Sequence, residues 1–485
     1  MALSNQPNRD LPKRWFRYGG LGLLGLLFAI GIKLYSQKSG LGVAIAPLPQ
    51  DPNIQVYFNH SQTSHYQEPY RNQSRLGDDL EQVILDIIDQ AQISIDVAIQ
   101  EINLPRISQA LMRKHQEGIQ VRVIVEDDYR QAWSTLADAE IPALGERDRH
   151  KYDEFLQLAD LNQDGDIQAQ EALQRDAIRI LELGQVPLID DTADGSKGSG
   201  LMHHKFVVVD NQVALTGSAN FTTSGIHGDF LNPESLGNAN HLVVIDNRAI
   251  AQILTNEFNL MWGDGPGGQE DSLFGLQKPY RPPQTVELAT GSKVTIQFAP
   301  LSGDRYPWEQ STNGLIQKTL QSAQESIDLA LFVFSEQPLS QTLHQKYQQN
   351  VAIRALIDSD FIYRSYSEAL DMMGVARLNQ QCNYDVDNTP WNPPLNTVGT
   401  PNLVDGDKLH HKFAVIDHKY VITGSQNWSK NANHRNDEAV IVLHNSVVSA
   451  HFLREFDRLY GHANCGVPHW LQLDIQNNQN RCSEG

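Results

Sequence analysis

The chain has 485 residues, of which 40% are hydrophobic, so it is long enough for two to four domains with substantial cores. Its 38 lysines and arginines are outnumbered by 58 aspartates and glutamates, which gives a formal net charge of −20 at pH 7. This acidic balance argues against a general nucleic-acid-binding protein, because long-range attraction to phosphate backbones needs positive charge, although it does not exclude a small basic groove.

The first 40 residues are typical of a membrane anchor or a signal segment. Lys13, Arg14 and Arg17 precede an apolar run at 18–32. Residues 15–35 could cross a thin bilayer, and the positive flank would place the N-terminus in the cytoplasm. We therefore expect a single N-terminal membrane helix with the rest of the chain outside the cytoplasm, in a periplasm or a lumen. A secreted protein with a cleaved signal is the alternative.

The rest of the chain contains one pattern twice. The segment AQISIDVAIQEI at Ala91 recurs as AQESIDLALFVF at Ala323, and VRVIVED at Val121 recurs as IRALIDS at Ile353; both spacings are 232 residues. Amphipathic helices alternate with apolar, β-branched strands, which predicts an α/β layer fold. The predicted elements are helix 80–91, strand 93–102, helix 107–117 and strand 120–126 in the first copy, and helix 314–323, strand 326–334, helix 339–348 and strand 352–358 in the second.

The repeats predict two domains of the same type. The first spans residues 51–262 and the second spans 289–465. A segment rich in Gly and Pro at 263–288 is interpreted as the linker between them, and 466–485 as a C-terminal tail.

The first copy contains a calcium-loop pattern. The next repeated segment begins at His203 and His410, a spacing of only 207 residues, so the first copy has 25 additional residues after Asp127. Within them, DLNQDGDIQAQE fits the twelve-residue EF-hand loop, with helical flanks. We expect an EF-hand insertion at 148–183 that binds Ca²⁺ in a structural or tuning role. The expected metal ligands are Asp160, Asn162, Asp164, Asp166 and Glu171.

A polar motif, His-x-Lys-x4-Asp-x6-Gly-Ser-x-Asn, occurs once in each copy within two apolar strands. Residues two apart in a strand share a face, so the first histidine of each pair points with the lysine, and His204 and His411 point away. The aspartates fall at strand ends and are expected to fix the following turn. The candidate residues are His203, Lys205, Asp210, Ser218 and Asn220, and His410, Lys412, Asp417, Ser425 and Asn427.

Two such motifs facing each other are suited to a phosphodiester. Lysines neutralise the phosphate charge, and the serine and asparagine side chains bind its non-bridging oxygens. One imidazole attacks phosphorus while the other protonates the leaving oxygen, and this chemistry requires no metal.

These paired motifs resemble those of the phospholipase D superfamily, the HKD phosphodiesterases, over residues 55–465. The resemblance implies two pseudo-twofold-related phospholipase D-like α/β/α domains, each a mixed sheet flanked by helices. It also implies one site at their interface, complete within a monomer. His203 then corresponds to the nucleophile that forms a phosphohistidine, and His410 to the general acid, although the reverse order is also compatible.

Members of this superfamily usually have acidic residues downstream that orient the histidines. In the second copy Asp437 and Glu438 occupy this place, whereas Asn240 occupies it in the first. An imidazole without a carboxylate partner is a poorer base, so the two histidines are expected to be unequal.

The core motif does not separate the phospholipases, phosphatidyltransferases and nucleases of the superfamily. A membrane tether would place the site beside lipid, and the acidic charge disfavours polynucleotides. We therefore expect a phospholipase D-type enzyme that hydrolyses phosphatidylcholine-like phospholipids and releases the head group and phosphatidic acid. A membrane-anchored nuclease acting on single-stranded nucleic acid and a phosphatidyltransferase of the cardiolipin synthase type are the alternatives.

The three cysteines fit no zinc-binding spacing. Cys465 and Cys482 lie close together in the sequence and could form a disulfide in an oxidising compartment. Free thiols are equally compatible with the sequence.

Overall fold

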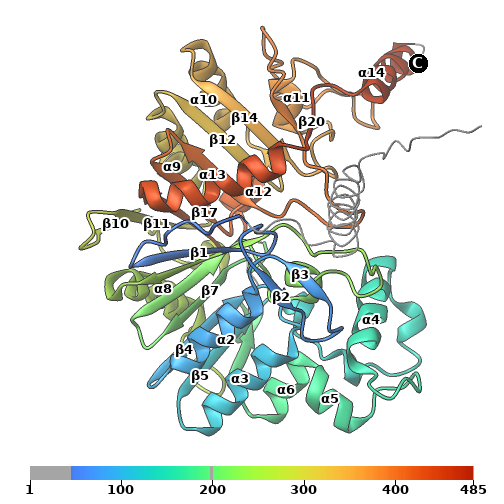
Figure 1. Ribbon diagram of the computed structural model, residues 1–485, viewed down its shortest axis with the longest axis vertical. Coiled ribbons are helices and arrows are strands. Elements are labelled where there is room, and N and C mark those ends of the chain that lie inside the picture. Colours follow the sequence, from blue (N-terminus) through green and yellow to red (C-terminus); the bar gives the residue numbers. More distant parts are fainter. Residues whose placement is uncertain (1–44, 197–199, 484–485) are drawn as a thin grey trace, which may run out of the picture. The chain divides into compact units, whose positions relative to one another are not determined.

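Two mixed β-sheets, each flanked by helices, organise the chain (Figure 1). The computed structural model describes residues 45–196 and 200–483. In sheet order, the first sheet contains β1 (Ile54–Phe58), β9 (His241–Asp246), β8 (Val213–Gly217), β7 (Lys205–Val209), β4 (Ser94–Ile99), β5 (Gln120–Val125) and β6 (Leu188–Asp190). The second contains β10 (Gln284–Glu287), β11 (Lys293–Ala299), β19 (Glu438–His444), β17 (Tyr420–Gly424), β16 (Lys412–Ile416), β12 (Ser326–Leu331), β14 (Ala352–Ile357), β15 (Val398–Thr400) and β20 (Asn464–Cys465). The predicted α/β fold is confirmed.

The sequence repeat reappears in the strand order. The run β1-β9-β8-β7-β4-β5-β6 has the same order as β11-β19-β17-β16-β12-β14-β15. β4 and β5 pair in parallel with Ser94 opposite Gln120, and β12 and β14 pair in parallel with Ser326 opposite Ala352. Both residues of the second pair are displaced by the same 232 positions. Equivalent residues therefore reach equivalent places in the two sheets.

Amphipathic helices form where the sequence predicts them. α2 (Leu80–Gln90) and α3 (Pro105–Gln116) pack on the first sheet, and α9 (Thr312–Gln321) and α10 (Gln337–Gln348) pack on the second. Asp79 begins α2 by accepting a hydrogen bond from the Gln82 amide at 3.0 Å. The strand predicted at 93–102 ends at Ile99 in the structure, because the two residues after it leave the sheet and point into polar contacts.

One buried apolar cluster joins the two sheets. It includes Phe206 of β7 and Phe413 of β16, together with Phe258 of α8 (Arg248–Trp262) and Phe452 of α13 (Ser446–Tyr460). Burial of each phenylalanine contributes roughly 2–3 kcal/mol, so this shared core holds the two sheets against each other. The strands that begin with the motif lysines therefore belong to one packed unit.

The insertion consists of helices around the calcium-loop pattern. α4 (Glu146–Ala159) precedes the loop and α5 (Ala169–Arg175) follows it. The helix expected after the loop is interrupted at Asp176, which ends α5 and caps α6 (Ala177–Leu183) by accepting from the Arg179 amide. The helical flanks that the sequence predicts are thus present, with one break.

Two segments interpreted as irregular contain regular structure. The predicted linker includes β10, which pairs with β11. The predicted tail forms α14 (His469–Ser483). Leu471 of α14 is fully buried against the second half of the chain, which explains why this segment is folded.

The cysteine pairing suggested by the sequence is wrong. Cys482 forms a disulfide with Cys382, 100 residues away, and Cys465 is an exposed thiol. β20 holds Cys465 at the edge of the second sheet through its pairing with β15, while α14 carries Cys482 back to the loop containing Cys382.

The predicted membrane anchor also requires correction. Among the residues that the structure describes, no helix combines the length and the apolarity needed to cross a membrane. The apolar run at 18–32 lies outside the described residues. Anchoring is therefore not supported, and the expected placement outside the cytoplasm, which depended on it, no longer stands.

Replacement of Cys482 by serine should destabilise the protein, because the disulfide closes a loop of about 100 residues in the unfolded chain. We expect the free energy of unfolding to fall by about 2–4 kcal/mol in urea denaturation without reductant. The Cys465→Ser variant is the matched control and should unfold like the wild type. Equal midpoints for Cys482→Ser and the wild type would contradict this pairing.

Candidate active site

Each histidine motif is held by the opposite half of the chain. The backbone amide of His203 donates to the carbonyl oxygen of Asp437 at 3.0 Å, and that of His410 donates to the carbonyl oxygen of Ala239 at 3.1 Å. Asp437 and Ala239 precede β19 and β9, the strands at equivalent places in the two sheets. This reciprocal pairing brings the two motifs together.

The histidine side chains also contact residues of the opposite half of the chain. His203 Nδ1 lies 2.8 Å from Glu438 Oε2, and His410 Nδ1 lies 2.9 Å from Asn240 Oδ1. The sequence shows that one copy has a carboxylate and the other an amide, and the structure shows that each serves the histidine of the other copy. With Nδ1 engaged, Nε2 of each ring remains for the substrate.

The serines of the motifs support these orienting groups. Ser425 donates to Glu438 Oε2 at 2.7 Å, and Ser218 donates to Asn240 Oδ1 at 2.8 Å. Both serines are fully buried. Their predicted role as direct phosphate ligands is therefore replaced by a role in holding the residues that orient the histidines.

The lysines and asparagines of the motifs bring N–H donors close to the histidines. Lys205 Nζ donates to the His203 carbonyl at 3.0 Å, and Lys412 Nζ donates to the His410 carbonyl at 2.8 Å. Gln100, which the sequence analysis missed, accepts from both Lys205 and Asn220. Gln100 directly follows β4, so the carboxyl end of a central strand contributes to the site. Asn220 and Asn427 complete the set of motif amides.

The motif aspartates are not part of the site. Asp210 follows the far end of β7 and accepts hydrogen bonds from the amides of residues 92–94. Asp417 accepts from those of residues 324–326 after β16. Each lies seven residues from its histidine, roughly 20 Å along a strand. The structure therefore does not bring them to the histidines, and instead of the turn that follows them they fix the turns before β4 and β12.

Asp437 also has a different role from the predicted one. Its carboxylate pairs with Lys278 at 2.7 Å and accepts from the Gly275 amide at 3.0 Å. Of the two predicted orienting acids, only Glu438 contacts a catalytic histidine through its side chain. Asp437 contributes its backbone carbonyl instead.

The second histidine of each pair has its own buried carboxylate. His204 lies 3.5 Å from Glu257, and His411 Nε2 lies 3.0 Å from Glu455. Both histidines are fully buried, on the side of the strands away from the lysines. This agrees with the supporting role that strand periodicity assigns to them.

Two further carboxylates that the sequence analysis missed hold the backbone just before the histidines. Glu126, after β5, accepts from the Met202 amide, and Asp358, after β14, accepts from the Leu409 amide at 2.7 Å. Burial raises the pKa of Glu126 to about 8 and that of Asp358 to about 6. Their equivalent places in the repeat, 232 residues apart, were the signal that could have revealed them.

Burial dominates the electrostatics of the site. It lowers the pKa of His203 and His410 well below the usual range, and the neighbouring lysines lower it further. Burial lowers the pKa of Lys205 to about 8 and raises that of Glu438 to about 7. The site therefore favours neutral imidazoles, the form that a nucleophilic histidine requires.

The calcium-loop residues are arranged around their own backbone. Asp160 accepts from the amides of Asp164 and Gly165 at 3.2 and 2.9 Å, and Glu171 accepts from the Leu161 amide at 2.8 Å. Gly165 has φ +89°, which lets the loop turn sharply. The first and twelfth positions thus face the loop, and a donor set made of oxygens fits a hard cation such as Ca²⁺.

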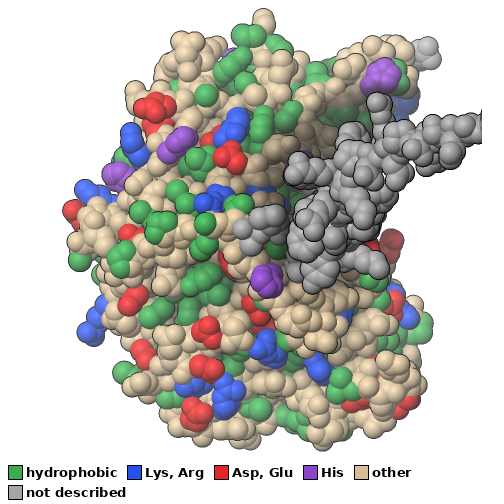
Figure 2. All heavy atoms as spheres, in the orientation of Figure 1, with side chains coloured by type: hydrophobic (Ala, Val, Ile, Leu, Met, Phe, Trp, Pro, Cys, Tyr) green, Lys and Arg blue, Asp and Glu red, His purple; other side chains and the backbone are tan. Residues whose placement is uncertain are grey.

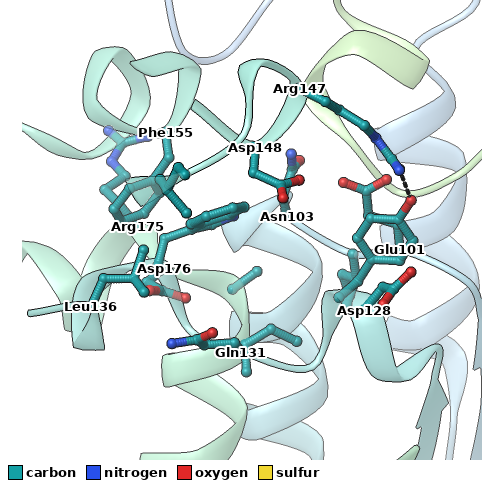
Figure 3. Close-up of a pocket in the computed structure, with 16 residues that line it drawn as sticks. Glu101, Asn103, Asp128, Gln131, Leu136, Arg147, Asp148, Phe155, Arg175 and Asp176 are labelled. Atoms are coloured by element: carbon teal, nitrogen blue, oxygen red, sulfur yellow. Dashed lines mark hydrogen bonds between the residues drawn. The ribbon is translucent and has the colours of Figure 1, made fainter. Parts of the chain in front are cut away.

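A cavity of about 220 Å³ separates the insertion from the carboxyl ends of β4 and β5 (Figure 3). Glu101 and Asn103 line it after β4, and Arg147, Asp148 and Phe155 line it from α4. None of the motif histidines or lysines lines this cavity. Helix α4 of the insertion thus lies beside the carboxyl ends of β4 and β5.

A family model described as "Cardiolipin synthase, PLD-like domain" matches residues 84–262 and 316–460. The chain belongs to this phospholipase D-like family of phosphodiesterases. Its family assignment agrees with the resemblance seen in the paired motifs.

Several relatives are known by name. The mitochondrial cardiolipin hydrolase of Canis lupus familiaris is 28% identical over 200 residues, which cover 38% of this chain and 70% of that protein. The human protein of the same name is 29% identical over 155 residues, 32% of this chain and 53% of the relative. The phospholipase D of Rickettsia prowazekii is 26% identical over 172 residues, 36% of this chain and 70% of the relative. The aligned segments thus cover between about half and 70% of these relatives.

One solved structure resembles nearly the whole chain. Phosphatidylserine synthase from Haemophilus influenzae covers 93% of this chain, and this chain covers 98% of it, with a TM-score of 0.51. At 11% identity this likeness concerns the fold alone.

The pKa values predict a narrow pH optimum. Below about pH 7, protonated Glu438 would donate to His203 Nδ1 and place the ring proton on Nε2, so kcat/KM should rise as pH increases through 7. Above about pH 8, Lys205 loses its charge, so kcat/KM should fall. A profile from pH 5 to 9 with a soluble phosphodiester measures both limbs. The Glu438→Gln variant should lose the acidic limb, and its persistence would refute this assignment.

Proposed function

We propose that the protein is a phospholipase D-type phosphodiesterase that hydrolyses the head-group ester of phospholipids through a covalent phosphohistidine. The observation that carries this proposal is the crossed pair of imidazoles, the buried His203 with Glu438 and the half-buried His410 with Asn240, beside two lysines. We take the two halves to be related by a pseudo-twofold axis through this site, which the shared strand order supports.

In the first step His203 Nε2 attacks phosphorus and the bond from phosphorus to the head-group oxygen breaks. His410 gives its proton to that oxygen, and the head group leaves as an alcohol. In the second step His410 takes a proton from water, whose oxygen attacks phosphorus, and the bond to His203 breaks to release phosphatidic acid. Lys205 and Lys412 neutralise the phosphate charge in both steps.

The unequal partners support this assignment of roles. A Glu438 carboxylate that accepts the Nδ1 proton increases the electron density of the His203 ring and makes it a better nucleophile. The neutral amide of Asn240 stabilises a His410 imidazolium less, so that imidazolium is a stronger acid. A bound phosphate anion would raise the pKa of His410 toward its usual range, which allows it to be protonated.

Phospholipids are favoured as substrates by the relatives and by the surface. The names of the relatives refer to cardiolipin hydrolase and phospholipase D. Acidic and basic side chains are interspersed on the described surface in Figure 2, which shows no extended basic patch on that face. A polynucleotide would need such a patch to neutralise several phosphates.

The substrate is tested on vesicles of phosphatidylcholine, phosphatidylethanolamine or cardiolipin. We expect release of the head group and formation of phosphatidic acid, or of the corresponding products of cardiolipin. Cleavage of single-stranded DNA without any lipid turnover would refute the proposal. Transfer to added glycerol at the expense of hydrolysis would instead favour a phosphatidyltransferase of the cardiolipin synthase type, which the description of the family also suggests.

Two substrates with different leaving groups distinguish the roles of the two histidines. p-Nitrophenol needs no proton to depart, so the His410→Ala variant should retain the burst of p-nitrophenol from an activated diester to within about tenfold, while it loses about 10²–10⁴-fold on a phospholipid. The His203→Ala variant should lose both reactions. Equal losses in the two variants on both substrates would contradict the assignment.

We also propose that the loop at 160–171 binds Ca²⁺ through side-chain oxygens of Asp160, Asn162, Asp164 and Glu171 and the backbone carbonyl of Asp166. When bound, the ion supplies positive charge that fixes the loop between α4 and α5. The inward-facing carboxylates at the first and twelfth positions support this proposal.

Calcium binding should stabilise the folded protein. At 100 times Kd the linkage is worth about 2.7 kcal/mol, so the melting temperature should be higher in Ca²⁺ than in a chelator. Glu171→Gln should abolish this difference. Asp153→Asn on α4, outside the loop, is the matched control and should preserve it. An unchanged melting temperature on chelation of the wild type would refute the metal site.

A further inference from the structure

We infer that Glu154 and Asp407 are positioning residues that hold His410 in its catalytic orientation; the inference rests on the phosphodiesterase function proposed above. Both lie outside the histidine motifs. They are connected through a loop, residues 227–237, that belongs to a part of the first half with no counterpart of equal length in the second. From Gly217 to Leu242 the first half has nine more residues than the second has from Gly424 to Val440.

Helix α4 of the insertion forms the first part of this connection. Glu154 is buried and accepts from the Thr223 hydroxyl at 2.6 Å and from the Phe230 amide at 3.4 Å. His150, one turn earlier, lies 2.9 Å from Asp229. The loop 227–237 is therefore fixed to the insertion at two successive residues.

The other end of the same loop is fixed to the second half of the chain. The Ser235 hydroxyl donates to Asp407 Oδ1, and the Leu236 amide donates to Asp407 Oδ2 at 2.8 Å. The Asn232 side chain also donates to the Asp405 carbonyl at 2.9 Å. Asp407 is buried, so both carboxylate oxygens are satisfied within the protein by this loop.

From these contacts the chain runs directly to the catalytic histidine and to its partner. His410 follows Asp407 by three residues, and Asn240 follows Leu236 by four. Between them, the Lys408 amide donates to Asn238 Oδ1 at 2.8 Å. The loop that binds Asp407 thus continues into Asn240, which accepts from His410 Nδ1, so one continuous segment contacts both the backbone and the ring of His410.

Among the described residues, which exclude 197–199, the crossing at His203 has no carboxylate at the position of Asp407. The residue equivalent to Asp407 by the 207-residue spacing is Gly200, and a Cβ there would lie only 2.5 Å from Asn436 Oδ1. His203 instead has a charge-assisted hydrogen bond to Glu438. His410 has only a neutral amide, whose weaker hydrogen bond orients the ring less strongly. The contacts of Asp407 and Glu154 with the loop 227–237 therefore support His410, the histidine whose own hydrogen bond orients it less strongly.

The first test replaces the hydrogen-bond-accepting carboxylates of Glu154 and Asp407 with leucine. Glu154→Leu and Asp407→Leu should each lower kcat on a phospholipid about tenfold or more, because a misplaced general acid transfers its proton poorly, while KM changes less than about twofold. The p-nitrophenol burst, which does not need the acid, should stay within about twofold of the wild type. Glu154→Gln keeps an acceptor for Thr223 and should restore most of kcat. Asp405→Asn, an exposed neighbour, is the matched control.

A loss of equal size on both substrates would show general destabilisation and overturn the inference, as would wild-type kcat in both leucine variants. Nitrogen NMR of histidine side chains provides a readout that does not depend on turnover. The variants should shift the ring resonances of His410 and leave those of His203 in place. If the wild type hydrolysed no lipid, the proposed function would fail, and the NMR result would still decide the positioning role.

Discussion

The site depends on a reciprocal exchange of hydrogen bonds between the two halves of the chain. The amides of His203 and His410 donate to carbonyls of the opposite half, and the two rings contact Glu438 and Asn240 across the same boundary. Neither half contains both an imidazole and the group that orients it. The shared apolar core is therefore a catalytic requirement as well as a source of stability, because separating the sheets would leave two histidines without partners.

Burying so many polar groups in one place is costly unless they are paired. Several of these groups are paired. The serines donate to Glu438 and Asn240, Glu455 lies 3.0 Å from His411, and Glu257 lies 3.5 Å from His204. Burial also tunes the chemistry, since it favours neutral imidazoles and raises the pKa of Glu438 to about 7.

Sequence periodicity and internal repetition predicted the helices, the strands and the two motif histidines, because these features depend on local pattern. These patterns could not predict which residues far apart in the sequence would contact each other. No local signal indicates that Glu438 would meet His203 from 235 residues away, or that Cys482 would pair with Cys382. The same limit explains the error at Asp210: its spacing within the motif is regular, yet the strand carries it to the far end of the sheet.

The asymmetry between the halves has a consistent physical interpretation. A repeat with two identical half-sites would have two equally basic histidines, and either could attack. Exchange of a carboxylate for Asn240 removes that equivalence, and it also weakens the bond that orients His410. At this place the loop 227–237 contacts Asp407, and α4 contacts the same loop; this part of the first half is longer than its counterpart in the second.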